Sequence, residues 1–313
     1  MVKRLQNKWA GSRMALPTVS AYALLVWLVC GLVQQGWWLQ IGFFSLSVIL
    51  MVLLNNINAL IRIYSRMVSC SYIMLMCCAC FLFPSLRGIV METCLIGALL
   101  ILFNTYQDKD APGTTYYAYV LFGCCTLAFP LFVWFVPLLW ALSATQLQTT
   151  SWRNWGASVL GLLTPYWIGL CWVAWKEDFG MLANHLMKMV EFNVTLHFAN
   201  ALNNSQLLVL VLLAVLAVVG IIHYLRKHHD DKIRIRLLYG FFIWLLVAAT
   251  LALLLMPQHY DAFVRIIIVC TAPLAGHFLA LTNTKVTNIA FFVILTITVL
   301  ITAYNAWTLL SLS

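Results

Sequence analysis

Four polar residues follow one another at helical spacing near the end of a long apolar run. Asn55, Asn58, Arg62 and Arg66 are separated by three, four and four positions, so an uninterrupted helix would place them on one face. Two guanidinium groups one turn apart suit a phosphate or pyrophosphate, because each offers a fork of N–H donors. The stripe therefore indicates a site for an anionic head group. The alternative is that the arginines anchor the helix at the membrane interface while the asparagines bond neighbouring helices.

A second group combines an imidazole, a carboxylate and a guanidinium within seven residues. These are His259, Asp261 and Arg265, which come between two apolar runs. Asp261 and Arg265 are four positions apart and can form an ion pair on a helix. The group could bind a substrate or move protons. The alternative is the start of a helix that carries an acidic residue in its first turn.

Isolated ionisable residues inside apolar runs are also candidates, because burying them in a membrane costs free energy. Glu92 lies one turn into such a run. We expect it to pair with Arg87 or to lie in a polar cavity, and we expect His277 to belong with it. Glu92 joins the candidate binding residues, whereas His277 is expected to be hydrogen-bonded without binding a ligand.

Metal and cofactor sites are not indicated. His228 and His229 precede Asp230 and Asp231, and metal capture by this run is one interpretation. We expect the run to be a solvated loop instead. The ten cysteines form no C-x-x-C pattern with a later His or Cys partner, so we expect small packing residues.

The elements that must position these residues are membrane helices. The chain of 313 residues is 64% hydrophobic with only 9% charged residues, where about 25% is usual for soluble domains. Apolar runs of 16 to 25 residues recur along it, and each is long enough, or nearly so, to cross ~30 Å of hydrocarbon. We therefore predict an all-α, polytopic transmembrane bundle in which residues 1–313 form a single integral membrane domain. The expected segments are 18–35, 38–61, 67–85, 88–105, 114–129, 130–147, 155–175, 206–225, 237–256, 262–282 and 286–309.

The run 114–147 decides whether there are ten or eleven segments. As one straight helix it would be ~51 Å long, beyond the hydrocarbon core. Pro130 and Pro137 interrupt it, so it is either one kinked span or two short crossings that meet near Pro130. We expect a proline-broken hairpin whose tip is covered by neighbouring helices, because the tip has no polar residue.

The distribution of positive charge supports the two crossings. With eleven segments and a cytoplasmic N-terminus, 14 of the 18 lysines and arginines face the cytoplasm, as the positive-inside rule requires. The four outer ones are Arg87, Lys176, Lys188 and Arg265. Membrane orientation thus accounts for the net charge of +9, and we expect no nucleic-acid partner.

The outer loop 176–205 contains a stretch with an apolar and a polar helical face. Leu182, Leu186 and Met189 share one face, and Asn184 and Lys188 share another. This pattern predicts an amphipathic helix on the outer membrane surface. It is either a strap between two spans or a lid over a site that opens to the outer interface.

Several of these strings together resemble a known family. They are Asn55–Asn56 followed by Arg66, the break at Phe129–Pro130, the run Ser151–Tyr166 with its Trp152, and Tyr260 followed by Arg265 and Pro273. The set is similar to a family of uncharacterised bacterial polytopic inner-membrane proteins, a domain of unknown function without an established activity. The resemblance covers most of the chain and implies its fold and location. It adds no catalytic residue.

Three functions are compatible with the sequence. The first is a protein of cell-envelope biogenesis that handles a lipid-linked or other amphiphilic anionic substrate, with His259 and Arg265 as the best residues for any reaction. A glycosyltransferase that uses lipid donors is disfavoured, because the first outer loop, residues 34–40, has no acidic residue. The second is a transporter or flippase, and the third is a non-enzymatic subunit or scaffold of a membrane complex. The expected partners are membrane lipids, a lipid-linked substrate and other membrane proteins.

Overall fold

The computed structural model describes residues 4–177, 179–191 and 202–312, and every regular element in these ranges is a helix. Within these ranges, seven helices are long and apolar enough to cross a membrane. Three shorter apolar helices accompany them: Ala15–Val29, Met67–Cys78 and Pro130–Thr145. The chain is therefore a multi-pass, all-α membrane protein, as its composition predicts.

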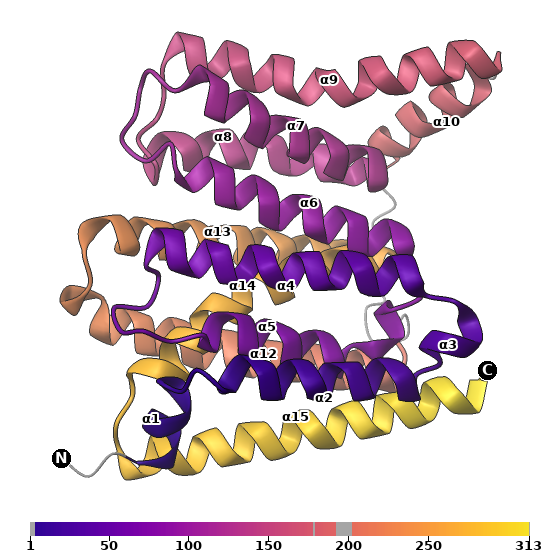
Figure 1. Cartoon of the computed structure of the whole chain (residues 1–313). Helices are drawn as coiled ribbons and strands as arrows, with labels where there is room; N and C mark the ends of the chain where they lie inside the picture. Colours follow the sequence, from indigo (N-terminus) through magenta and orange to yellow (C-terminus); the bar gives the residue numbers. More distant parts are fainter. Residues whose placement is uncertain (1–3, 178, 192–201, 313) are drawn as a thin grey trace.

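Eleven helical segments of the described ranges run back and forth along the bundle (Figure 1). They are α2 (Ala15–Val29), α4 (Trp38–Asn58), α5 (Met67–Cys78), α6 (Leu86–Phe103), α7 (Pro112–Ala128), η2 with α8 (Pro130–Phe135 and Val136–Thr145), α9 (Trp152–Lys176), α12 (Asn204–Lys227), α13 (Ile233–Leu255), α14 (Tyr260–Leu281) and α15 (Lys285–Leu312). The short helices are α1 (Leu5–Ala10), α3 (Leu32–Gln35), η1 (Cys80–Leu82), α10 (Phe179–Val190), η3 (His228–Asp230) and η4 (Pro257–His259).

The two ends of the bundle differ in charge. The N-terminus and the C-terminus lie at opposite ends (Figure 1). Of the described lysines and arginines, only Arg87, Lys176, Lys188 and Arg265 belong to the C-terminal side. We call the side of the N-terminus the basic end and the other side the opposite end. The predicted division of charge thus matches the two ends, and the assignment of the basic end to the cytoplasm stays a prediction.

The run 114–147 forms the predicted proline-broken hairpin. Helix α7 ends before Phe129, whose backbone is extended (φ −136°, ψ 99°), because a following proline disfavours helical geometry. At the far side of the hairpin, the amide of Gln107 donates to the carbonyl of Leu147 at 2.8 Å. Residues 107 and 147 therefore meet at the basic end, so the run folds back on itself as a hairpin, and its crossing of the membrane twice stays a prediction.

Helix α14 lies at the centre of the bundle. Its apolar stretch is 89% buried, and it packs against α5, α6, α12 and α13. By contrast, α15 is only 17% buried and lies along one side of the bundle, while α7 and α9 pack together on another (Figure 1). Polar groups on α14 are therefore the ones most shielded from lipid.

The predicted stripe of Asn55, Asn58, Arg62 and Arg66 on one helix is wrong. Helix α4 ends at Asn58, and Ala59 adopts left-handed geometry (φ 49°) that turns the chain. The side-chain amide of Asn55 donates to the backbone carbonyl of Ser65 at 2.8 Å. This bond holds the turn against the end of the helix. Such local side-chain bonds compete with helix continuation. Arg62 consequently lies in the turn, and Arg66 precedes α5.

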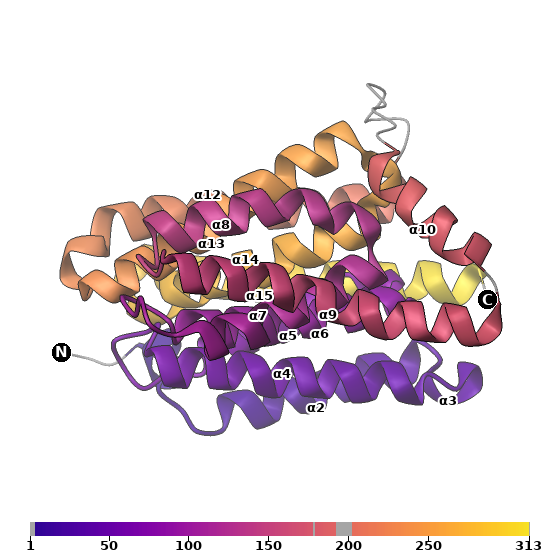
Figure 2. The same cartoon turned by 90° about the horizontal axis from the view of Figure 1, so that it is seen from above.

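Two other boundaries concern the spans that border the opposite end. The predicted span 18–35 is divided, because Gly31 (φ 100°) separates α2 from the single turn α3. In the predicted loop 176–205, α10 is the expected amphipathic helix, and its Leu186 and Val190 side chains are exposed. It crosses the other helices at an angle (Figure 2). Residues 192–201 of this loop lie outside the described residues.

Candidate functional site

A buried ion pair joins α6 to α14 near the opposite end. Nη1 of Arg265 lies 2.8 Å from Oε2 of Glu92, and both side chains are fully buried. The sequence suggested Arg87 as the partner of Glu92. In the structure, Glu92 pairs with Arg265 instead. The two partners are 173 positions apart, so the pair fixes α6 against the central helix.

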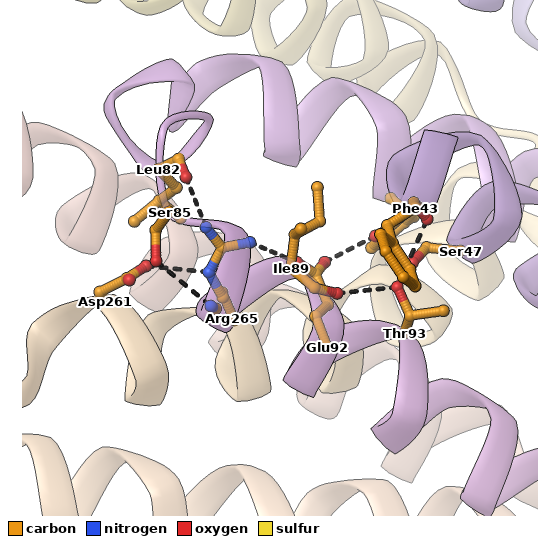
Figure 3. Close-up of polar contacts among 11 residues, drawn as sticks. Phe43, Ser47, Leu82, Ser85, Ile89, Glu92, Thr93, Asp261 and Arg265 are labelled. Atoms are coloured by element: carbon orange, nitrogen blue, oxygen red, sulfur yellow. Dashed lines mark hydrogen bonds and ion pairs between the residues drawn. The ribbon is translucent and has the colours of Figure 1, made fainter. Parts of the chain in front are cut away.

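The remaining polar atoms of this pair are also bonded (Figure 3). Nε of Arg265 donates to Oδ1 of Asp261 at 2.8 Å, which confirms the predicted pairing, and Nη2 donates to the carbonyl of Leu82 at 2.5 Å. The Tyr72 hydroxyl donates to Oε1 of Glu92 at 2.6 Å. We call Tyr72, Glu92, Asp261 and Arg265 the buried charge network. Since its guanidinium is fully bonded, an incoming anion would have to displace a carboxylate from Arg265.

The start of α6 is shaped to receive this guanidinium. The Ser85 hydroxyl caps the helix by accepting a bond from the Gly88 amide at 3.2 Å. A Cβ atom at Gly88 would lie only 2.5 Å from Nε of Arg265. Glycine at this position therefore lets the charged group pass directly over the helix backbone.

A polar hollow of about 230 Å³ lies beside the buried charge network. Arg87, His259 and Asp261 line it together with Gln258 and Phe129. The Asp261 side chain is 44% exposed, so its carboxylate serves both the network and the hollow. We call this space the opposite-end hollow. Of the predicted site residues it brings together His259 and Asp261, with Arg265 and Glu92 behind them.

Arg87 provides the accessible positive charge of the hollow. Its side chain is exposed, and within the described ranges no carboxylate forms an ion pair with it. The His259 ring packs edge-on against Phe129, with ring centroids 5.5 Å apart. As far as the described residues go, the hollow thus offers a guanidinium outside any ion pair, an imidazole packed against the hairpin tip and an anchored carboxylate. Sequence reasoning did not select Arg87, although it is one of only four positive residues of this side.

Helix α10 borders this region. The Trp134 indole in η2 donates to the carbonyl of Met189 at 2.8 Å, and η2 directly follows Phe129 of the hollow. The amphipathic helix is therefore anchored on the hairpin that forms one wall of the site.

The other predicted site residues lie at the basic end and in separate surroundings. Nη1 of Arg62 pairs with Asp230 at 3.3 Å, and Nε of Arg66 donates to the Tyr64 hydroxyl at 3.2 Å. Oδ1 of Asn58 accepts a bond from Arg234 at 2.9 Å. These side chains do not form a common site for one anionic group.

A second buried pair, at the basic end, was not predicted. Nε2 of His277 on α14 lies 3.1 Å from Oδ2 of Asp231, and both side chains are almost completely buried. The His223 ring packs against His277 at a tilt of 55°, with centroids 5.4 Å apart. His277 therefore does not belong with Glu92, and Asp231 is not a solvated loop residue. We call His223, Asp231 and His277 the histidine cluster.

Three buried polar atoms of this cluster have no hydrogen-bond partner in the described part of the chain: Oδ1 of Asp231, Nδ1 of His277 and Nε2 of His223. A buried histidine in an apolar helix requires a partner, and this requirement was the only sequence feature that could have pointed to a nearby acid. Neighbouring His228 instead bonds to the carbonyl of Leu225 at 2.8 Å. No group of three or more potential metal ligands is found among the described residues.

Comparison of the chain with models of known families, with curated proteins and with solved structures finds no match. The fold and the geometry of the opposite-end hollow are therefore the basis for any functional conclusion, and the family resemblance stays a prediction.

Proposed function

We propose that the chain is a bacterial inner-membrane protein of cell-envelope biogenesis that handles a lipid-linked or other amphiphilic anionic substrate at the opposite-end hollow. The observation that carries this proposal is the exposed guanidinium of Arg87, which pairs with no carboxylate of the described residues and lies beside His259 and Asp261. A guanidinium binds phosphate through two parallel N–H donors. An anionic head group is therefore the ligand chemistry that suits the hollow best.

The surroundings of the hollow suit the apolar part of such a substrate. The hollow is at one end of the membrane helices, where the head group of a lipid lies. Helix α10 next to it exposes Leu186, Met187 and Val190, as expected for a helix in the plane of the interface. An amphiphile could place its phosphate at Arg87 while its chain remains in the bilayer.

The buried charge network supports this site from behind. Arg265 holds the Asp261 carboxylate in place, Glu92 holds Arg265, and the Tyr72 hydroxyl in turn donates to Glu92. Asp261 is thus a fixed acceptor, and the His259 ring offers a nitrogen that can accept a proton. This combination fits binding of an anion and removal of a proton from a hydroxyl of the same substrate.

Binding of a polyprenyl phosphate to the purified protein tests the proposal. We expect native mass spectrometry to show tighter binding of polyprenyl phosphate than of the uncharged polyprenol. Arg87→Gln should lower the affinity for the phosphate about tenfold, since hydrogen bonds between charged groups contribute roughly 1.5–3 kcal/mol. Arg153→Gln is the matched control, because Arg153 is exposed at the basic end.

Equal affinity of wild type and Arg87→Gln for the phosphate would contradict the site. In cells, loss of the gene should change the lipid-linked glycans of the envelope, and Arg87→Gln should fail to restore them at normal protein abundance. Unchanged glycans in the deletion strain would contradict the role in envelope biogenesis.

A flippase is the second candidate, and one observation favours it. The central helix α14 carries a buried ionisable group toward each end, Arg265 with Glu92 and His277 with Asp231. Buried ionisable pairs of this kind are common in proton-coupled transporters. In liposomes with a fluorescent lipid phosphate, a flippase would expose the inner-leaflet label to an added quencher, and Asp231→Asn would reduce this exposure. The scaffold hypothesis is the least supported of the three, because it requires neither the hollow nor the buried pairs.

A further inference from the structure

An apolar cleft lies at the basic end, on the side of the bundle away from the opposite-end hollow. It encloses about 80 Å³ between α5, α14 and α15, and Trp9 of α1 covers it. Leu295 of α15 lines the cleft and is itself 41% exposed. The cleft therefore reaches the lipid-facing surface of α15, the least buried of the long helices.

One polar atom inside the cleft has no partner. The Ser71 side chain lines the cleft, and its buried hydroxyl makes no hydrogen bond in the described part of the chain. A hydroxyl left unbonded in an apolar site costs free energy. A serine on α5 could bond its own helix backbone, as Thr93 does on α6, yet this one does not. The free hydroxyl indicates a ligand with a hydrogen-bonding group at this depth.

A basic hollow adjoins the cleft at its membrane-surface side. This second space, of about 340 Å³, is lined by Lys8 and Ser12 and shares Trp9 and Phe291 with the cleft. Lys8 forms no ion pair with a described carboxylate. Moving inward from the end of the bundle, the exposed Lys8 is thus followed by the buried Ser71 hydroxyl and then by apolar side chains.

We infer that this cleft binds an anionic phospholipid, with the phosphate at Lys8, an ester carbonyl at the Ser71 hydroxyl and one acyl chain between α5 and α15. The order of charge, hydrogen-bond donor and apolar wall matches the order of groups along such a lipid. An apolar space that opens to the bilayer is filled by acyl chains rather than by water. Positive residues near the membrane surface add the preference for anionic head groups.

Native mass spectrometry with defined lipids tests this inference. We expect wild type to retain phosphatidylglycerol more strongly than phosphatidylcholine. Lys8→Gln should weaken retention of phosphatidylglycerol about fivefold, the effect of one basic residue near a membrane surface. Lys109→Gln, an exposed change elsewhere at the same end, should have no effect.

Two further variants address the cleft itself. Ser71→Ala removes no bond to a described protein group, so it should not lower the thermal stability of the lipid-free protein, and it should weaken retention of both lipids. Met74→Trp places a larger side chain in the cleft and should abolish retention. Equal retention of the two lipids by wild type, or full retention by Met74→Trp, would overturn the inference. A wild-type dimer that becomes a monomer on Met74→Trp would also overturn the inference, because a second copy of the chain would then occupy the cleft. Binding at Arg87 is at the other end of the bundle and is scored separately, so failure of one site does not decide the other.

Discussion

At the scale of single residues, the buried guanidinium of Arg265 is tolerated because several partners bond to it. Arg265 has three hydrogen bonds, to Asp261, Glu92 and a backbone carbonyl. The cost of burying a guanidinium is offset only when its donors are satisfied in this way. Removal of one partner should therefore lower the free energy of unfolding by much more than a single hydrogen bond contributes.

Glu92→Ala tests this expectation. It leaves Arg265 buried with only the partly exposed Asp261 as counter-charge, so the free energy of unfolding should fall by about 3–5 kcal/mol. Asp261→Asn is the milder comparison, because the Asp261 side chain is 44% exposed. The amide oxygen of the new asparagine could also still accept the bond from Arg265. Thermal unfolding of the purified proteins in detergent measures both. Similar losses for the two variants would show that Glu92 is not the principal counter-charge.

The adjacent acids Asp230 and Asp231 provide a matched pair for the histidine cluster. Asp231→Ala leaves His277 buried without its partner and should cost about 1–3 kcal/mol of stability. Asp230→Ala breaks the exposed pair with Arg62, whose worth is about 0–1 kcal/mol. The order of the two melting temperatures checks that Asp231 is the buried partner of His277. A larger loss of stability from Asp230→Ala than from Asp231→Ala would contradict this pairing.

At the scale of helices, close packing is set by small residues at the contacts. Helices α7 and α9 approach so closely that a Cβ atom at Gly161 would lie 2.5 Å from the carbonyl oxygen of Tyr116. In a bilayer, where lipid and helix surfaces are equally apolar, van der Waals packing and interhelical hydrogen bonds drive such association. The pair α7 and α9 forms one side of the bundle, and α7 leads to the hairpin tip at the opposite-end hollow.

Gly161→Val should separate these two helices. Because the obstacle is backbone, the side chain cannot be accommodated by a rotamer change, and overpacking should cost about 1–3 kcal/mol. Gly169→Val is the control on the same helix, since nothing lies within 4 Å of its added Cβ. Thermal unfolding measures the loss, and equal melting temperatures for the two variants would contradict the close contact.

The helices themselves could be predicted from the sequence better than the contacts between them. Apolar length and the positive-inside rule identified eleven segments, because both depend on composition along the chain. The stripe ending at Arg66 failed because one residue, Ala59, takes left-handed geometry, and periodicity contains no information about such a break. The partners Glu92 and Arg265 are 173 positions apart, and only the packing of α6 on α14 brings them together. Asp231 was misjudged for the same reason.

At the scale of the whole molecule, the number of crossings and the charge of the two ends are linked. Eleven segments place the termini at opposite ends, and the hairpin at Pro130 returns the chain to the basic end (Figure 1). The same hairpin places Phe129 beside His259 at the opposite-end hollow. The proposed substrate site at the opposite end and the proposed lipid cleft at the basic end therefore both depend on this topology.

Labelling of single cysteines with a membrane-impermeant reagent tests that topology in intact cells. Suitable positions are exposed on the two ends: Gln107 and Gln148 at the basic end, and Gln34 and Ser311 at the opposite end. Replacing Cys171 with Ser first removes the exposed native thiol. With the basic end in the cytoplasm, Gln34→Cys and Ser311→Cys should react from outside, whereas Gln107→Cys and Gln148→Cys should react only after permeabilisation. Since residues 107 and 148 flank the hairpin, labelling of one but not the other would overturn the two crossings. Reversal of all four would keep the eleven segments and place the hollow with Arg87 on the cytoplasmic face.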